Sequence, residues 1–208
     1  MVSKLSLEEF RQIKNNSNTE VLDIRHQSEF IVGHISCSIF VGIDGLFEPW
    51  VELFIEKQAP ILLISPEGRE AEAYDKLTKI GFKNIKGYLE GSFKTWQQAN
   101  LPTEDITSIS VLKLEELLKE DALEIFDIRK QNEYDAGHLP NVNFKPLAEL
   151  TNTLQDFALK NNTTYIHCGG GYRSVIACSI LKQNGIHSVV DIAGGFGAIR
   201  KTNLAIES

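Results

Sequence analysis

One cysteine of this chain stands in a segment that favours chemistry at its thiol. Three consecutive glycines allow backbone conformations closed to other residues, so their N–H groups can turn inward and form a cradle for an anion. A thiol at the rim of such a cradle is a candidate nucleophile. We therefore take Cys168 as the candidate catalytic residue, and as candidate substrate-binding residues those that follow it: Gly169, Gly170, Gly171, Tyr172, Arg173 and Ser174.

Three features are expected to favour the thiolate form of Cys168. They are the inward amides, the positive end of a helix predicted to begin near Ser174, and the guanidinium of Arg173. A thiolate formed in this way needs no separate general base, and it can attack the outer sulfur of thiosulfate or of a small-molecule persulfide. An acceptor thiol or cyanide would then remove that sulfur. The predicted chemistry is transfer of a sulfane sulfur through a cysteine persulfide.

Other interpretations of the same residues explain less. The loop lacks the lysine of a phosphate-binding P-loop and the spaced glycines of a dinucleotide-binding turn. Cys37 and Cys178 lack comparable neighbours, so both are expected to serve packing. No spacing of histidine and cysteine is typical of a zinc site. We therefore expect neither a metal nor a cofactor.

The elements that must position this loop occur twice in the chain. Asp23, Arg25 and His34 recur 104 positions later as Asp127, Arg129 and His138. A spacing near half the chain indicates duplication of a whole domain. We predict one domain over residues 1–101 and a second over residues 108–208, joined by a short polar linker that contains proline.

Each half is predicted to alternate strands with helices. Short apolar runs predict strands at residues 21–24, 61–64, 124–128, 164–167 and 188–192. Helices are predicted at residues 69–80 and 174–184, each followed by a glycine suited to end it. The fold class is therefore α/β, with a parallel sheet flanked by helices in each domain. Cys168 directly follows a predicted strand, at the sheet edge where such folds bind ligands.

Composition limits the environment and the partners. The formal net charge of −7 over 208 residues argues against nucleic acid or an anionic membrane as a partner. Three cysteines without a Cys-x-x-Cys pair favour a reducing compartment. No apolar run approaches the ~20 residues of a membrane span. We expect a soluble, cytoplasmic protein whose partners are a small anionic sulfur donor and a thiol or cyanide acceptor.

Asp127, Arg129, His138 and the glycine-rich segment after Cys168 occur in the order found in a rhodanese domain. The second half resembles such a domain over nearly its whole length, and the first half resembles one too. The resemblance implies that Cys168 carries the sulfur, that the amides of residues 169–174 surround it, and that Arg173 braces the loop or meets the donor's anion. It also implies support from a buried Arg–carboxylate network, because buried charges persist only when paired. The supporting residues matched by the motifs are Asp127, Arg129, Glu133 and His138.

A narrower resemblance concerns residues 166–174 together with residues 87–93. These segments look like the paired rhodanese modules that follow a metallo-β-lactamase-fold domain in persulfide dioxygenase-like fusions. The resemblance implies a metallo-β-lactamase-fold partner domain, which residues 1–208 do not include.

The first half departs from the pattern at the loop. Ser65 stands where the second half has Cys168, Pro66 removes one amide donor, and Glu70 replaces Arg173. A serine hydroxyl without a base is a poor nucleophile and cannot hold a persulfide. We therefore expect an inactive first domain, with a regulatory anion site at Ser65 and Arg69 as the alternative.

Two other functions compete with a sulfurtransferase. One is a sulfur-relay or binding module that accepts sulfur from a fused or partner persulfide oxygenase without turnover. The other is a cysteine phosphatase or arsenate reductase, whose loops by family resemblance usually place five residues between Cys and Arg. Here four residues separate Cys168 from Arg173. This tighter ring suits one sulfur atom better than a tetrahedral oxyanion.

Overall fold

The computed structural model describes residues 2–16, 18–120, 122–158 and 163–208. The chain divides into two compact units between Asp105 and Ile106. The predicted linker, which joins the domains expected at residues 1–101 and 108–208, spans this boundary. Each unit is described by itself.

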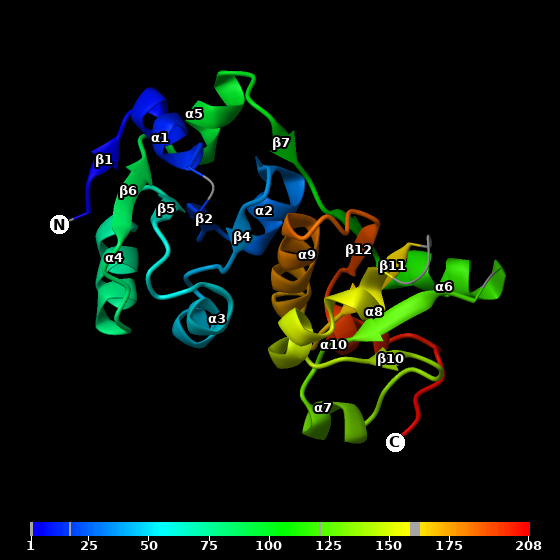
Figure 1. The fold of residues 1–208 in the computed structure, drawn as a ribbon. Coiled ribbons are helices and arrows are strands. Elements are labelled where there is room, and N and C mark those ends of the chain that lie inside the picture. The colour runs from blue at the N-terminus through cyan, green and yellow to red at the C-terminus, as the bar shows by residue number, and fades with distance from the viewer. Residues whose placement is uncertain (1, 17, 121, 159–162) are drawn as a thin grey trace. The chain divides into compact units, whose positions relative to one another are not determined.

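The first unit contains strands and helices that mostly alternate along the chain (Figure 1). Its strands are β1 (Lys4–Leu5), β2 (Glu20–Asp23), β3 (His34–Ile35), β4 (Ile39–Phe40), β5 (Ile61–Ile64), β6 (Ile85–Leu89) and β7 (Thr103–Glu104). Its helices are α1 (Leu7–Lys14), α2 (Gln27–Val32), α3 (Phe47–Phe54), α4 (Glu70–Lys79) and α5 (Ser92–Gln98).

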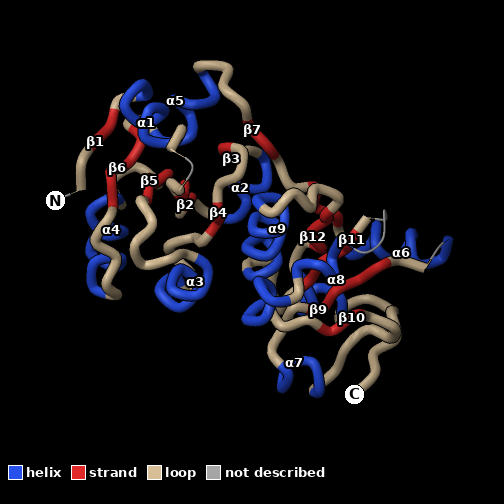
Figure 2. The backbone as a smooth tube through the Cα atoms, in the orientation of Figure 1, coloured by secondary structure: helices blue, strands red, loops and turns tan. Residues whose placement is uncertain are grey.

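The second unit repeats this alternation (Figure 2). Its strands are β8 (Thr107–Ile109), β9 (Glu124–Asp127), β10 (Asn143–Phe144), β11 (Thr164–His167) and β12 (Val189–Ile192). Its helices are α6 (Val111–Glu120), α7 (Gln131–Asp135), the 3₁₀ helix η1 (Leu147–Asn152), α8 (Leu154–Ala158), α9 (Arg173–Gln183) and α10 (Gly195–Ile199).

Each unit has its own five-stranded sheet, and the two sheets have the same topology. The strand order is β1-β6-β5-β2-β4 in the first and β8-β12-β11-β9-β10 in the second, and neighbouring strands pair in parallel. Strands β2 and β5 pair Asp23 with Ile64, and β9 and β11 pair Asp127 with His167. The predicted α/β class, with a helix-flanked parallel sheet in each half, is confirmed.

Helices cover the sheets through alternating apolar residues. In the second unit, Ile125 packs in one cluster with Leu114 of α6 and Ile199 of α10. The next residue, Phe126, stacks on Phe157 of α8 at a centroid distance of 4.2 Å, on the opposite face. In the first unit, α1 and α5 form one cluster over the sheet, and α3 and α4 lie on its other side (Figure 1).

Local sequence signals set the element ends. Ser6 and Glu9 form a capping box at the start of α1. Gly81 and Gly185 follow α4 and α9 with φ angles of 94° and 81°, the left-handed conformation that ends a helix and that glycine adopts without strain. The predicted linker also contains β7, which pairs antiparallel with β3, and the start of β8.

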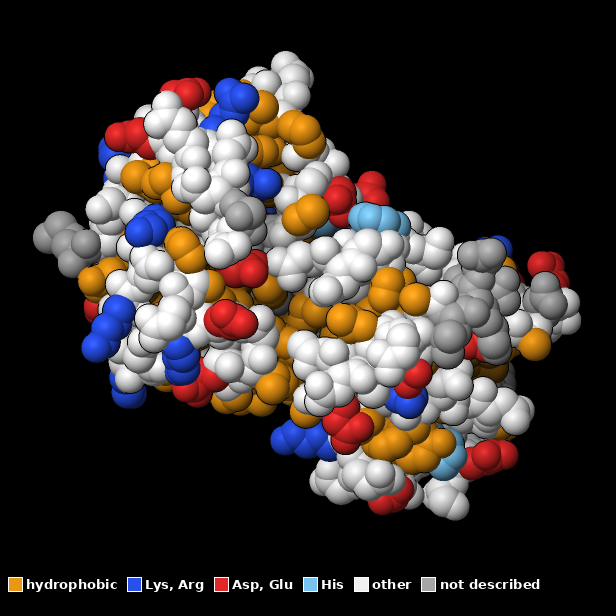
Figure 3. All heavy atoms as spheres, viewed as in Figure 1, with side chains coloured by type: hydrophobic (Ala, Val, Ile, Leu, Met, Phe, Trp, Pro, Cys, Tyr) orange, Lys and Arg blue, Asp and Glu red, His pale blue; other side chains and the backbone are white. Residues whose placement is uncertain are grey.

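The surface and the helix lengths bear on the expected partners. Lys and Arg side chains are interspersed with Asp and Glu on the face drawn in Figure 3. Within the part of the chain that the structure describes, no helix is both long enough and apolar enough to cross a membrane.

Candidate active site

The predicted catalytic cysteine lies between β11 and α9, at the carboxyl end of the parallel sheet. Cys168 is buried, with 1% of its surface exposed. The backbone N–H of Gly171 donates a hydrogen bond to Cys168 Sγ over 3.1 Å, and Ser174 Oγ lies 3.7 Å from the same sulfur. An amide aimed at a sulfur favours negative charge on it. The sulfur is thus closed off from bulk solvent but contacted by a main-chain donor.

Helix α10 fixes the first two peptides of the loop. The N–H of Phe196 donates to the carbonyl of Cys168 over 2.7 Å, and the N–H of Gly197 donates to the carbonyl of Gly169 over 2.8 Å. In a planar trans peptide the C=O and the following N–H point in opposite directions. The N–H groups of Gly169 and Gly170 therefore point away from α10.

This contact requires a glycine at the start of α10. Gly195 has a φ of +52°, and a Cβ at this position would lie 2.3 Å from the carbonyl oxygen of Cys168. That separation is far below a van der Waals contact, so any side chain would push α10 away from the loop. Gly195 is thus a site residue that the sequence analysis did not assign.

Arg173 is held by a carboxylate. Its Nη1 and Nη2 donate to the two carboxylate oxygens of Glu133 over 2.7 Å each. These hydrogen bonds, opposed by partial burial, lower the pKa of Glu133 to about 2. The pair is therefore charged at neutral pH and ties the first turn of α9 to α7. Of the two roles expected for Arg173, these contacts fit the bracing one.

A second ion pair lies deeper. Asp127 is fully buried and accepts hydrogen bonds from Arg129 Nε, Nη2 and N over 2.6–3.0 Å. Arg129 also donates to the carbonyls of Glu133 and Gly137, over 2.9 and 2.8 Å. Its guanidinium lies over the ring of Phe196, 3.8 Å from the centroid. The pair thus links the end of β9 to α7 and α10.

The structure brings three of the four predicted supporting residues into one network. His138 is the exception, because its side chain contacts Tyr134 and not the ion pairs of this network. Its ring stacks on Tyr134 at a centroid distance of 3.8 Å, and its Nδ1 contacts the carbonyl of that residue over 3.1 Å. Its backbone bridges to Glu207 near the C-terminus. Tyr172, also a candidate binding residue, is the N-cap residue of α9.

Two buried polar residues next to the loop were given no role from the sequence. His167 precedes Cys168, and its Nδ1 lies 3.3 Å from the Cys168 carbonyl oxygen. Asp191 accepts a hydrogen bond from Ser108 over 2.7 Å, and burial raises its pKa although hydrogen bonds from Ser174 and Ser108 oppose the shift. Neither residue belongs to the glycine-rich segment, so the sequence did not indicate these contacts.

The remaining cysteines lie in different surroundings. Cys178 is fully buried within α9, and this burial raises the pKa of its thiol well above the ordinary value, the opposite of what a nucleophile needs. Cys37 is exposed in the first unit, and none of the three cysteines forms a disulfide bond. Among the described residues, no group of three or more His, Cys, Asp or Glu side chains could hold a metal ion.

The equivalent loop of the first unit satisfies its own donors. Ser65 is 2% exposed, and its hydroxyl donates to the carbonyl of Pro66 over 2.8 Å. The N–H of Gly68, the counterpart of the Gly171 N–H, donates to the carboxylate of Glu70 over 3.2 Å. Arg69 is paired with Asp44 and Glu72. The loop thus binds a carboxylate of its own chain.

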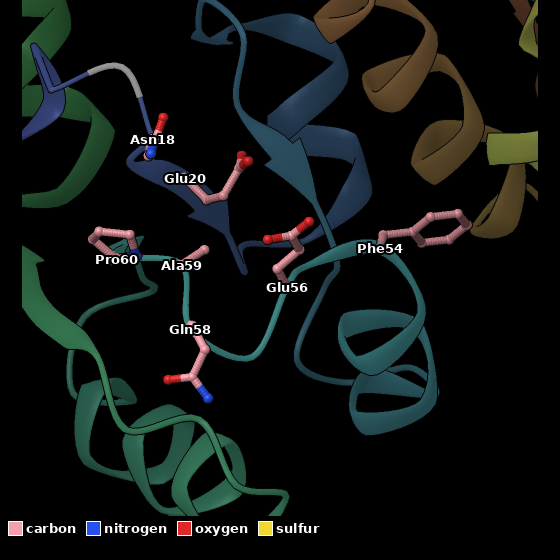
Figure 4. Close-up of a pocket in the computed structure, with 7 residues that line it drawn as sticks. All are labelled: Asn18, Glu20, Phe54, Glu56, Gln58, Ala59 and Pro60. Carbon is pink, nitrogen blue, oxygen red and sulfur yellow. The ribbon is translucent and has the colours of Figure 1, made fainter.

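The first unit also has a surface hollow of about 520 Å³ at the opposite end of its sheet (Figure 4). Glu20 begins β2, and Pro60 directly precedes β5, so the hollow lies at the amino ends of these strands. Ligands of open α/β sheets bind at the carboxyl ends. We therefore assign it no part in the chemistry. Its lining residues are Asn18, Glu20, Phe54, Glu56, Gln58, Ala59 and Pro60.

Comparisons with known proteins bear on both units. A family model described as Rhodanese-like domain matches residues 6–99 and again residues 110–202. Putative sulfur carrier protein YrkF of Bacillus subtilis is 30% identical over 97 residues, which are 45% of this chain and 52% of that protein. Thiosulfate sulfurtransferase GlpE of Pseudoalteromonas translucida is 32% identical over 90 residues, which are 43% of this chain and 85% of that protein.

The matches are partial in extent. The chain covers 52% of YrkF and 57% of the uncharacterized Bacillus subtilis protein YqhL, about half the length of each. Among solved structures, a rhodanese-like domain protein from Staphylococcus aureus is 34% identical with a TM-score of 0.45 and aligns over 50% of this chain and 100% of its own. Of the two segments matched by the family model, the second contains Cys168 and the first contains Ser65.

Proposed function

Because this chain belongs to the family of rhodanese-like domains and carries two of them, we propose that its second unit is a sulfurtransferase that works through a persulfide on Cys168. The observation that carries the proposal is the hydrogen bond from the Gly171 N–H to Cys168 Sγ. A main-chain donor that stabilises a thiolate can also stabilise the terminal sulfur of a persulfide, since both are anionic sulfur.

The proposed reaction has two half-reactions. In the first, the Cys168 thiolate attacks the terminal sulfur of a persulfide R–S–S⁻, the donor S–S bond breaks, and R–S⁻ leaves as Cys168 becomes Cys–S–S⁻. With thiosulfate as donor the leaving group is sulfite. In the second, a thiolate or cyanide attacks the terminal sulfur and releases the Cys168 thiolate. No net oxidation occurs, and the residues invoked are a nucleophile, its amide donor and the ion pairs that hold the loop.

Intact-mass measurement of the full chain tests the proposal. Incubation with glutathione persulfide or thiosulfate is expected to add ~32 Da, the mass of one sulfur in the covalent intermediate. Cys168→Ser should gain nothing, and Cys37→Ser, which removes an exposed thiol, should gain one sulfur like the parent. Sulfur added equally to Cys168→Ser would refute the proposal.

A second candidate is the sulfur-relay module, which is favoured by the similarity to YrkF, a protein named as a putative sulfur carrier. Under this alternative Cys168 accepts sulfur but passes it only to a partner, with a metallo-β-lactamase-fold oxygenase as the partner that the sequence resemblance suggests. Loading without release to cyanide, glutathione or cysteine would favour the relay. Release at a steady rate would favour the enzyme.

The phosphatase alternative is tested separately. Turnover of small phosphate esters or arsenate that disappears in Cys168→Ser would replace the sulfurtransferase proposal. We expect none, because the four residues between Cys168 and Arg173 close a ring around one sulfur and Arg173 is already bound by Glu133.

A further inference from the structure

His167 is a buried polar residue without an assigned role. Its side chain is fully buried at the end of β11, and its Nε2 has no hydrogen-bond partner among the described residues. The nearest carboxylate oxygen, Asp127 Oδ2, is 3.8 Å away and already accepts from Arg129. Leaving a buried polar atom unpaired costs stability, so its presence calls for an explanation.

The duplicated chain supplies an internal comparison. Ile64 is the counterpart of His167 in the first unit, one residue before Ser65, and it is also fully buried. Both residues end equivalent strands, and their carbonyls accept equivalent backbone bonds, from Ile24 and from Ile128. The fold therefore needs no histidine at this position. The polar side chain is present only in the unit that has the cysteine.

The other ring nitrogen of His167 contacts the candidate active site. His167 Nδ1 lies 3.3 Å from the carbonyl oxygen of Cys168, which also accepts the N–H of Phe196. A carbonyl oxygen only accepts, so this contact assigns the proton to Nδ1. Burial lowers the pKa of His167 more strongly than the neighbouring Asp127 carboxylate raises it, which keeps the imidazole neutral. The neutral ring is thus a donor on one side and unpaired on the other.

We propose that His167 is a positioning residue that orients the Cys168–Gly169 peptide through its Nδ1–H bond to the Cys168 carbonyl. Two donors on one carbonyl fix the plane of that peptide better than one, and the planar peptide transmits the orientation to the Gly169 N–H, the first amide of the loop. In this proposal the unpaired Nε2 lowers the stability of the second unit, and the gain is a more exact placement of the loop. The inference rests on the proposed function, because it concerns the rate at which Cys168 accepts sulfur.

Two substitutions in the full chain separate positioning from structural support. His167→Ile introduces the residue that the first unit uses. We expect kcat for sulfur transfer from glutathione persulfide to cyanide to fall about tenfold with little change in KM, the size of effect that one hydrogen bond gives. Amide hydrogen exchange in α9 reports on the stability of the second unit alone. It is expected to slow in this variant, because the unpaired Nε2 is gone. A purely structural residue would give faster exchange.

His167→Asn is the rescue variant. Its side-chain nitrogen is the same number of bonds from Cα as His Nδ1 and can donate to the same carbonyl, so it should recover most of the lost kcat. His187→Ile, which replaces an exposed histidine before β12, is the matched control and should leave both kcat and exchange unchanged.

The outcomes are distinct. If the unsubstituted chain gains no sulfur at Cys168, the proposed function fails. Suppose instead that the unsubstituted chain gains sulfur at Cys168. If His167→Ile then transfers sulfur to cyanide with the same kcat as that chain, or shows faster amide exchange in α9, only the inference about His167 is overturned. Equal losses in His167→Ile and His167→Asn would also overturn it.

Discussion

At the scale of single residues, the candidate site is built from three polar contacts of different burial. The Asp127–Arg129 pair is buried, the Glu133–Arg173 pair is partly exposed, and the Gly171 N–H contacts the Cys168 sulfur directly. Breaking a buried ion pair destabilises a protein strongly, because it leaves a charge without water or a partner, whereas an exposed pair contributes little to stability. The two pairs therefore give different expectations for substitution and for pH.

The buried pair is expected to be necessary for the fold of its unit. Asp127→Ala leaves Arg129 charged and buried without its partner, so the free energy of unfolding of the second unit should fall by about 3–5 kcal/mol. Asp23→Ala removes the equivalent partner of Arg25 and is the matched substitution in the first unit. Both are measured by urea denaturation. A loss below ~1 kcal/mol in either unit would contradict the account of a buried charge left unpaired.

The partly exposed pair predicts a pH dependence. Because the pKa of Glu133 falls from 4.5 to about 2 in the folded chain, its contribution to stability is fully present above pH 4.5 and is lost as pH falls toward 2. The difference in unfolding free energy between the parent and Glu133→Gln should thus stay constant from about pH 6 to pH 8 and shrink in acid. Denaturant titrations at several pH values measure it. A difference that shrank near neutral pH would show that Glu133 is not held by Arg173.

At the scale of elements, the sequence predicted what depends on local pattern. The strand predicted at 164–167 is β11, the one at 61–64 is β5, and the helices before Gly81 and Gly185 end where expected. The edge strands β4 and β10 were missed, because two residues carry no periodic signal and pair only once the neighbouring strand is in place. The contacts of Gly195 and His167 with Cys168 were missed because they depend on tertiary packing, which no local pattern in the sequence indicates.

The approach of α10 to the loop gives a prediction at this scale. Gly195→Ala places a Cβ 2.3 Å from the Cys168 carbonyl at a φ unfavourable to other residues, so α10 must move and the Phe196 bond to Cys168 must weaken. We expect at least a tenfold loss of the sulfur-loading rate, on the order of one lost hydrogen bond, and a lower thermal midpoint.

Gly170→Ala is the control for stability in this experiment. A Cβ at Gly170 would have no neighbour within 4 Å, so this variant should keep the thermal midpoint of the parent. Calorimetry compares the two variants with the parent chain. If Gly195→Ala matched Gly170→Ala in stability, α10 would not be held against the loop by this contact.

At the scale of the whole molecule, duplication produced two equal frames and two unequal loops. The sheets share one strand order, and both units keep an Asp–Arg pair at the end of the same strand. The loops differ in what their amides bind. The Gly171 N–H contacts the Cys168 sulfur, whereas the Gly68 N–H contacts the carboxylate of Glu70. A hollow of about 530 Å³ beside Glu70 is lined by further charged residues, among them Glu67, Glu90 and Lys94.

This difference predicts that a cysteine alone will not restore chemistry to the first unit. In a Cys168→Ser background, Ser65→Cys is expected to gain no sulfur from glutathione persulfide, because Glu70 occupies the amide and repels a thiolate. Adding Glu70→Arg and Pro66→Gly removes that carboxylate, supplies a cation and restores an amide donor, so a gain of ~32 Da should appear at position 65. Intact mass and peptide mapping measure it. Tryptophan fluorescence of Trp50 and Trp96, both in the first unit, checks that each variant is folded. Full loading in the single Ser65→Cys variant would mean that the frame, and not the charge around the loop, decides which unit can carry sulfur.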